Sequence, residues 1–305
     1  MNPNHSHNTV YWGRYRFLFL GFLFPVFHYL IMLLVQALAT VVMSLTFSMG
    51  QNITVTEVEE KTLFYLTAYA DVFSLISAFL TAILAVLVYR IIVSKLERRQ
   101  MPSPSLKTYF SLQRIPRSLV FKLLLLAFFF YHFVLGFLNL IDKLAPSLME
   151  SYRDAAQSVN AGNSAFSLIM SFLALVVAAP ITEELIYRNM AISNMRSRLP
   201  AVLSVFLSSL IFGVFHGNLV WMLYAGGIGI LFGFLYVKSE SVYVSLAVHI
   251  GFNLIGYLYS VMGNFMPDSA MSTVNTISFA LILVSIIGAP LVFLWVWLDL
   301  SQKAD

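Results

Sequence analysis

Long apolar runs separated by short polar segments are the dominant pattern of this sequence. A membrane-spanning helix needs about 20 mostly apolar residues. By this measure the apolar runs form about eight candidate segments: 17–47, 63–94, 118–141, 164–187, 200–216, 219–237, 241–262 and 276–298. The pattern therefore predicts an all-α fold, a polytopic bundle of transmembrane helices.

The composition agrees with a protein embedded in lipid. Of the 305 residues, 59% are hydrophobic and 10% are charged, whereas a soluble domain carries about 25% charged residues. The chain has no cysteine, which excludes disulfides, thiol catalysis and thiolate metal ligands. We expect a multi-pass integral membrane protein of a bacterial cell membrane, with membrane lipids as partners and no nucleic acid.

The placement of the charges predicts the orientation of the bundle. Of the 18 basic residues, only Lys61, Lys143 and Arg153 lie in the linkers that are otherwise acidic. Because basic residues are retained on the cytoplasmic side, both termini are expected in the cytoplasm. The longest basic connection, 95–117, then serves as a topology signal, with binding to anionic lipid headgroups as an alternative.

The same pattern divides the chain into four parts without a separate soluble domain. They are a cytoplasmic tail 1–16, an N-terminal membrane region 17–160 with the basic loop 95–117, a core 161–262 that holds the candidate chemistry, and a last span with the C-terminal tail 263–305.

Two adjacent carboxylates, Glu183 and Glu184, stand out in the apolar run that ends at Tyr187. A charged side chain at the centre of a membrane costs about 2.5–3.5 kcal/mol and is usually functional. Glu184 is four residues before Arg188, the spacing that pairs an acid and a base on one helix face. Neighbouring residues point about 100° apart, so Glu183 is left for chemistry. Pro180 cannot donate to the carbonyl of residue 176 and is expected to kink the helix.

Two later segments supply the other polar groups of a candidate site. His216 follows Phe212 by one helical turn, and Asn253 follows His249 by the same spacing. A carboxylate, two imidazoles and a carboxamide can together activate water and stabilise an oxyanion, as peptide hydrolysis requires. We interpret Asp71 and His132 as structural, bonded to each other, to the backbone or to water.

The motifs EELIYR (183–188), FGVFH (212–216) and HIGFN (249–253) resemble those of the CPBP intramembrane proteases. This family includes the type II CAAX prenyl endopeptidases and the bacteriocin-processing and immunity (Abi) proteins. The resemblance covers residues from about 165 to 260. It implies an intramembrane endopeptidase that hydrolyses a peptide bond near the cytoplasmic membrane face with activated water.

The resemblance also implies a role for each residue of the three motifs. Glu183 would be the general base, assisted by His216, while His249 and Asn253 would line the oxyanion site. The supporting residues would be Glu184, Arg188 and Phe212, the last of which packs beside His216. No cofactor is predicted, although the family's glutamate dependence and metal dependence stay open; a zinc or other divalent ion would use Glu183, His216 and His249.

The depth of His216 requires a particular course of the chain. From Pro200 to His216 a helix would rise about 24 Å, too far for a partner of Glu183 if Pro200 sat at the membrane surface. We therefore expect the helix that carries Glu183 to extend to about Arg196. Residues 217–220 would then form a break within the membrane, which is tolerated only inside protein or along a water-filled cavity.

Competing functions remain for the same residues. For a peptidase we expect the substrate to be a peptide or a membrane-protein segment, with or without a lipid anchor. Prenylated C-termini, bacteriocin precursors and peptide pheromones are all candidates. The alternative is a non-catalytic membrane protein of the same scaffold that acts in bacteriocin immunity or partner binding. A transporter with a protonatable Glu183 is a third interpretation, although the chain lacks paired interrupted helices in two matching halves.

Overall fold

The computed structural model describes residues 21–49, 54–97, 110–157 and 164–301. This part of the chain is helical and holds no strand. Its helices before the core are α2 (Phe24–Ser48), α3 (Val55–Ala68), α4 (Ala70–Glu97), α6 (Arg117–Leu144) and α7 (Pro146–Gln157). The predicted tail 1–16 and most of the basic connection 95–117 lie outside the described residues.

One continuous helical span, Ala165–Met195, carries the two glutamates. It consists of α8 (Ala165–Ser171), the π-helical η2 (Phe172–Ala178), α9 (Ala179–Glu183), the π-helical η3 (Glu184–Ile192) and α10 (Ser193–Met195). Four helices follow it: α11 (Ala201–Val214), α12 (Leu219–Ser239), α13 (Val242–Phe265) and α14 (Asp268–Ser301). The expected extension of this span to about Arg196 is confirmed.

The predicted all-α, polytopic bundle is confirmed. Among the described residues, 7 helices are long and apolar enough to cross a membrane. The remaining predicted segment, 200–216, corresponds to α11, which is apolar but shorter at 14 residues. The chain is therefore a multi-pass integral membrane protein, in which one of the predicted segments is a short helix that packs against α12.

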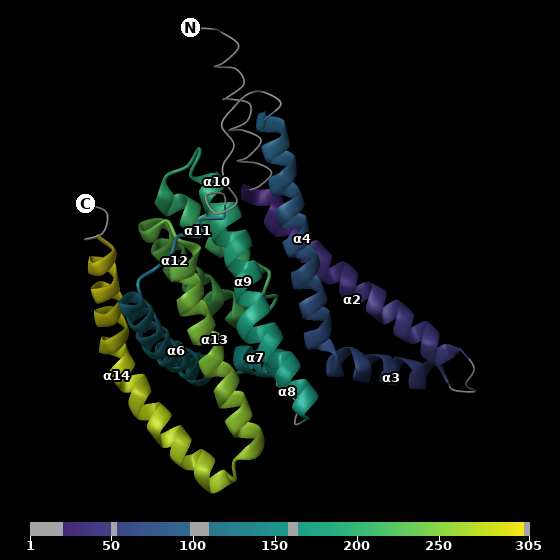
Figure 1. Cartoon of the computed structure of the whole chain (residues 1–305). Helices are drawn as coiled ribbons and strands as arrows, with labels where there is room; N and C mark the ends of the chain where they lie inside the picture. Colours follow the sequence, from purple (N-terminus) through teal and green to yellow (C-terminus); the bar gives the residue numbers. More distant parts are fainter. Residues whose placement is uncertain (1–20, 50–53, 98–109, 158–163, 302–305) are drawn as a thin grey trace.

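The predicted segment 63–94 is wrong at its start. Residues 63–68 belong to α3, a separate helix that lies across the lower ends of α2 and α4 in Figure 1. Thr54 and Glu57 form a capping box at its N-terminus, with Glu57 accepting from the Thr54 backbone amide at 2.7 Å. That hydrogen bond lowers the pKa of the exposed Glu57 carboxyl. Because the cap starts a helix ahead of the apolar run, the span begins only at Ala70.

The core of the bundle packs around the span Ala165–Met195. On one side, α6, α12, α13 and α14 share a hydrophobic core that includes Leu123, Phe232 and Val248. On the other side, α2 packs against η3, and α4 packs against η2 and α9; Figure 1 shows α2 and α4 on that side of the span. The helix that carries the glutamates is therefore enclosed from both sides.

Asp71 and His132 have structural partners, but not each other. The hydroxyl of Ser171 donates to Asp71, which joins α4 to α8. His132 bonds the carbonyl of Phe128 at 2.8 Å and the hydroxyl of Tyr259 at 3.1 Å. Both residues thus tie helices together away from the candidate site.

Candidate active site

The helix around Glu183 has a changed hydrogen-bond register. In η2 the amide of Ala179 donates to the carbonyl of Ala174, five residues back. In that register the carbonyl of Leu175 would be paired with the nitrogen of Pro180, which carries no hydrogen. The side-chain amide of Asn253 donates to this Leu175 carbonyl instead, at 2.8 Å.

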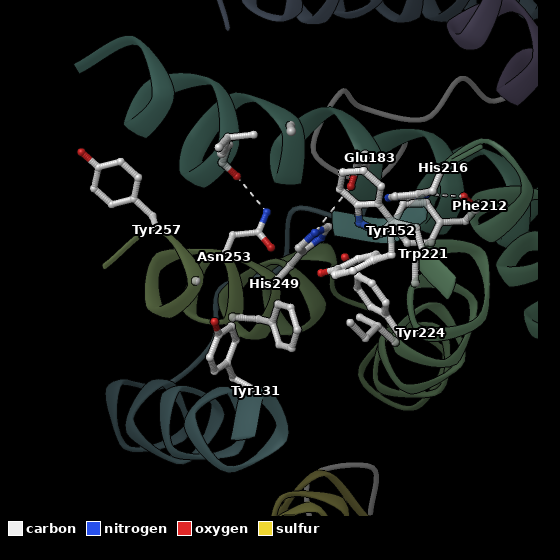
Figure 2. Close-up of a pocket in the computed structure, with 16 residues that line it drawn as sticks. Tyr131, Tyr152, Glu183, Phe212, His216, Trp221, Tyr224, His249, Asn253 and Tyr257 are labelled. Carbon is white, nitrogen blue, oxygen red and sulfur yellow. Dashed lines mark hydrogen bonds and ion pairs between the residues drawn. The ribbon is translucent and has the colours of Figure 1, made fainter. Parts of the chain in front are cut away.

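This contact corrects our expectation about which carbonyl Pro180 leaves without a donor. From an α-helical register we expected Pro180 to leave the carbonyl of Val176 without a partner, whereas the π register shifts that effect to Leu175. Asn253 reaches across from α13 and fills the gap (Figure 2). Short π segments inside α-helices are frequent at functional sites, and this one bonds to Asn253 of the third predicted motif.

The predicted pair of Glu184 and Arg188 is present. The Nε of Arg188 lies 3.3 Å from Oε2 of Glu184, and both side chains are almost completely buried. The guanidinium also lies over the rings of Phe212 and Phe232, 4.9 and 5.4 Å from their centroids. The pair therefore joins the span to α11 and α12 as well as along its own helix.

His249 lies between the two carboxylates. Its Nδ1 is 2.9 Å from Oε1 of Glu184, and its Nε2 is 3.5 Å from Oε2 of Glu183. A carboxylate can only accept, so Nδ1 carries the hydrogen that is donated to Glu184. This leaves Nε2 directed at Glu183. Sequence reasoning missed the bond between residues 184 and 249, because no spacing along the chain relates them.

The two glutamates differ in access. The side chain of Glu183 is 21% exposed, whereas that of Glu184 is 1% exposed. The expected division into one structural and one available carboxylate is consistent with this difference.

His216 lies just after α11, at the predicted break. Its Nδ1 donates to the carbonyl of Phe212 at 2.8 Å, which leaves the lone pair on Nε2. The chain then turns at Gly217, whose φ of 77° favours glycine. Asn218 begins α12 by accepting the amide of Val220 at 3.0 Å. The expected interruption of the helix is present, shifted slightly towards residues 215–218.

One cavity of about 330 Å³ brings the predicted residues together (Figure 2). Glu183, Phe212, His216, His249 and Asn253 all line it. We expected His216 beside Glu183. In the described part of the chain, however, the histidine that contacts the Glu183 carboxylate is His249. Glu184 and Arg188 lie behind this wall, where they hold His249 in place.

The other walls of the cavity are largely aromatic and were not predicted. They come from α6, α7, α12 and α13 and comprise Tyr131, Tyr152, Trp221, Tyr224, Phe252 and Tyr257. Tyr152 stands edge-on to Trp221, with ring centroids 5.9 Å apart. Aromatic residues make up 15% of the chain, so their positions alone could not single these out.

The described side chains are not gathered into a preformed metal site. Within the described ranges, no group of three or more His, Asp or Glu residues is arranged to hold a metal ion. The residues named for that role, Glu183, His216 and His249, line one cavity. Both histidines donate through Nδ1, and the Nε2 of His249 lies 3.5 Å from Oε2 of Glu183.

Comparison with known proteins agrees with the motifs. Residues 165–255 match the family model described as type II CAAX prenyl endopeptidase Rce1-like. The chain is also similar to "Putative membrane peptidase YdiL" of Bacillus subtilis (strain 168), with 29% identity over 77 residues. That match covers 25% of this chain and 32% of the relative, so the chain spans about a third of the relative's length. No solved structure matches the chain significantly.

Proposed function

We propose that this chain, which carries a CPBP-family segment at residues 165–255, is an intramembrane endopeptidase. The observation that carries the proposal is the convergence of Glu183, His216, His249 and Asn253 on one cavity from three separate helical segments. Both histidines donate through Nδ1, and their proposed roles differ because only His249 lies between two carboxylates.

Glu183 and His216 form the basic side of the proposed site. The carboxylate of Glu183 and the Nε2 lone pair of His216 both accept hydrogen bonds, so they can hold a water molecule between them. In the reaction, Glu183 takes a proton from this water as its oxygen attacks the scissile carbonyl carbon. The same proton then passes to the leaving amine as the C–N bond breaks.

His249 and Asn253 form the polarising side. With Nδ1–H held by Glu184, His249 acts in this mechanism in the form that carries a hydrogen on Nε2 as well. This N–H can donate to the carbonyl oxygen as negative charge develops there. The amide of Asn253 has two N–H groups, one of which is used by Leu175, so the second is available to the same oxygen. No step requires a metal ion.

The comparison of wild type with Glu183→Gln tests the proposal. Purified proteins are incubated with a peptide library, and the products are read by mass spectrometry. A general base contributes about 10²–10⁴-fold to a rate, so cleavage should fall at least 100-fold in the variant. The matched control is Glu60→Gln, which makes the same chemical change at an exposed position of α3 and should cleave like wild type.

The outcomes separate the candidate functions. Cleavage by Glu183→Gln at the wild-type rate contradicts the assignment of the base. Absence of cleavage by wild type, Glu183→Gln and Glu60→Gln alike favours the non-catalytic scaffold. Assay of the wild type after exhaustive chelation, together with elemental analysis, tests the metal-independent mechanism, since activity that returns only with added zinc contradicts it.

A further inference from the structure

The cavity extends from Glu183 towards the end of the bundle at which the span begins. We infer that the substrate reaches Glu183 from the extracytoplasmic end, past α7, and is a polypeptide segment presented on that side of the membrane. The substrate class rests on the proposed peptidase function, whereas the route of access is a property of the fold and is tested without catalysis.

The route towards the opposite end is closed. Every residue from Ile186 to Ile192 is buried, and the guanidinium of Arg188 fills the space between Phe212 and Phe232. Beyond them, the hydroxyls of Ser193 and Tyr236 are 2.5 Å apart. The half of the span that follows Glu183 therefore packs as solid core.

Hydrogen bonds between the span and α13 define the direction of the cavity. From one end to the other they are His249 to Glu184, Asn253 to the carbonyl of Leu175, and Tyr257 to the carbonyl of Leu168. The residue numbers rise in α13 as they fall in the span, so the two helices are antiparallel. Leu175, Ala179, Gly256 and Tyr257 line the cavity, so it runs from Glu183 towards residue 165.

The helix α7 borders the cavity at that end. Its Tyr152 lines the cavity, and its Ser151 accepts from the side-chain amide of Asn218 at 3.0 Å, at the break before α12. In Figure 1 the start of α8 and the turn between α13 and α14 lie at the end of the bundle opposite α10. The cavity thus approaches the linkers of that end.

Charge identifies this end as extracytoplasmic. Its linkers carry Glu57, Glu59, Glu60, Asp142, Glu150, Asp154 and Asp268 against three basic residues. At the closed end, by contrast, the described basic residues include Arg114, Arg117, Arg196, Arg198 and Lys238. Because basic residues are retained in the cytoplasm, the closed end is cytoplasmic. This inference differs from our prediction from the sequence, in which the site serves the cytoplasmic face.

The lining indicates what the cavity accepts. Its volume of about 330 Å³ lies at the lower end of the range for ligand pockets. Tyr152 of α7 and Trp221 and Tyr224 of α12 form an aromatic wall of the cavity, with the rings of Tyr152 and Tyr224 edge-on and their centroids 6.1 Å apart. This wall suits a short extended peptide with a bulky apolar side chain next to the scissile bond. The substrate is therefore an exported peptide or the extracytoplasmic segment of a membrane protein.

Single cysteines test the route, since the natural chain has none. Ala179→Cys is placed in the cavity of the full-length protein and treated with a membrane-impermeant maleimide in sealed right-side-out and inside-out vesicles. Two exposed positions report the two sides: Ser269→Cys at the start of α14 and Ser197→Cys after α10. We expect labelling of Ala179→Cys and Ser269→Cys in right-side-out vesicles, and of Ser197→Cys in inside-out vesicles.

Each other outcome overturns the inference. Labelling of Ala179→Cys from the side that labels Ser197→Cys, or from neither side, contradicts the route. Labelling of Ser269→Cys from the cytoplasm contradicts the orientation. Leu175→Cys, which also lines the cavity, replaces Ala179→Cys if that variant is not produced. Repeating the labelling with Glu183→Gln separates access from catalysis, because an inactive protein should be labelled equally.

Discussion

The hydrogen bond from Asn253 to the carbonyl of Leu175 makes a sharp prediction about stability. Replacing Asn253 with leucine removes the donor with little change in volume and leaves the partly buried carbonyl of Leu175 without this partner. Leaving such a group unpaired costs about 1–3 kcal/mol. We expect Asn253→Leu to destabilise the fold by about 2 kcal/mol within that range.

The cost should depend on Pro180. In Pro180→Ala the nitrogen of residue 180 carries a hydrogen, so a π register supplies Leu175 with a backbone donor. An α register does so as well, through the amide of Ala179. Either way the carbonyl no longer needs Asn253. The double variant should therefore lose less than the sum of the single changes, with a coupling of at least about 0.5 kcal/mol.

Tyr257→Phe is the matched control. It removes a hydroxyl that donates to the carbonyl of Leu168 at 3.1 Å, between the same two helices. That carbonyl also accepts the backbone amide of Phe172, so it keeps a partner. We expect a smaller loss of stability for Tyr257→Phe, and no coupling to Pro180→Ala.

Unfolding in mixed detergent–SDS micelles, followed by circular dichroism, measures all these variants. Strictly additive effects of Asn253→Leu and Pro180→Ala would refute the reasoning. Equal coupling of Tyr257→Phe to Pro180→Ala would refute it too, since the effect would then reflect general helix distortion.

Two further predictions concern packing and the buried ion pair. Alanine at Gly213 would place Cβ 2.6 Å from the carbonyl oxygen of Met222, so Gly213→Ala should separate α11 from α12 and cost about 1–3 kcal/mol. Gly227→Ala meets nothing within 4 Å and should be neutral in the same unfolding assay, and a loss equal to that of Gly213→Ala would contradict the contact argument. Glu184→Gln leaves Arg188 buried without its carboxylate and should cost about 3–5 kcal/mol. The double variant with Arg188→Met removes the unpaired charge, so it should be more stable than Glu184→Gln; a less stable double variant argues against a charge penalty.

Contacts between residues close together in the sequence could be predicted for part of the candidate site. The four-residue spacing of Glu184 and Arg188 predicts their contact, because neighbours on a helix face are determined by helix geometry alone. The same holds for the spans, whose length and apolar composition reflect the thickness of the membrane. The division between α3 and α4 was missed, since the apolar character of residues 63–68 continues without a change into the following helix.

Long-range contacts could not be predicted in this way. The bond of His249 to Glu184 and that of Asn253 to Leu175 both join segments that are far apart along the chain. Residue types suggested that these groups take part in one site, but not which atoms meet. The partner of Glu183 was therefore expected to be His216, whereas the described contact is with His249.

By itself, the sequence determined that this is a polytopic helical membrane protein, which of its charges fall within apolar runs, and which three motifs resemble those of a peptidase family. Those features depend on hydrophobicity and on spacing within single helices. Only the tertiary structure decided that His249 bridges two carboxylates and that the cavity extends towards α7. The physical reason is that hydrogen-bond partners and cavity walls are set by the packing of helices against one another, and that packing has no signature in the spacing along the chain.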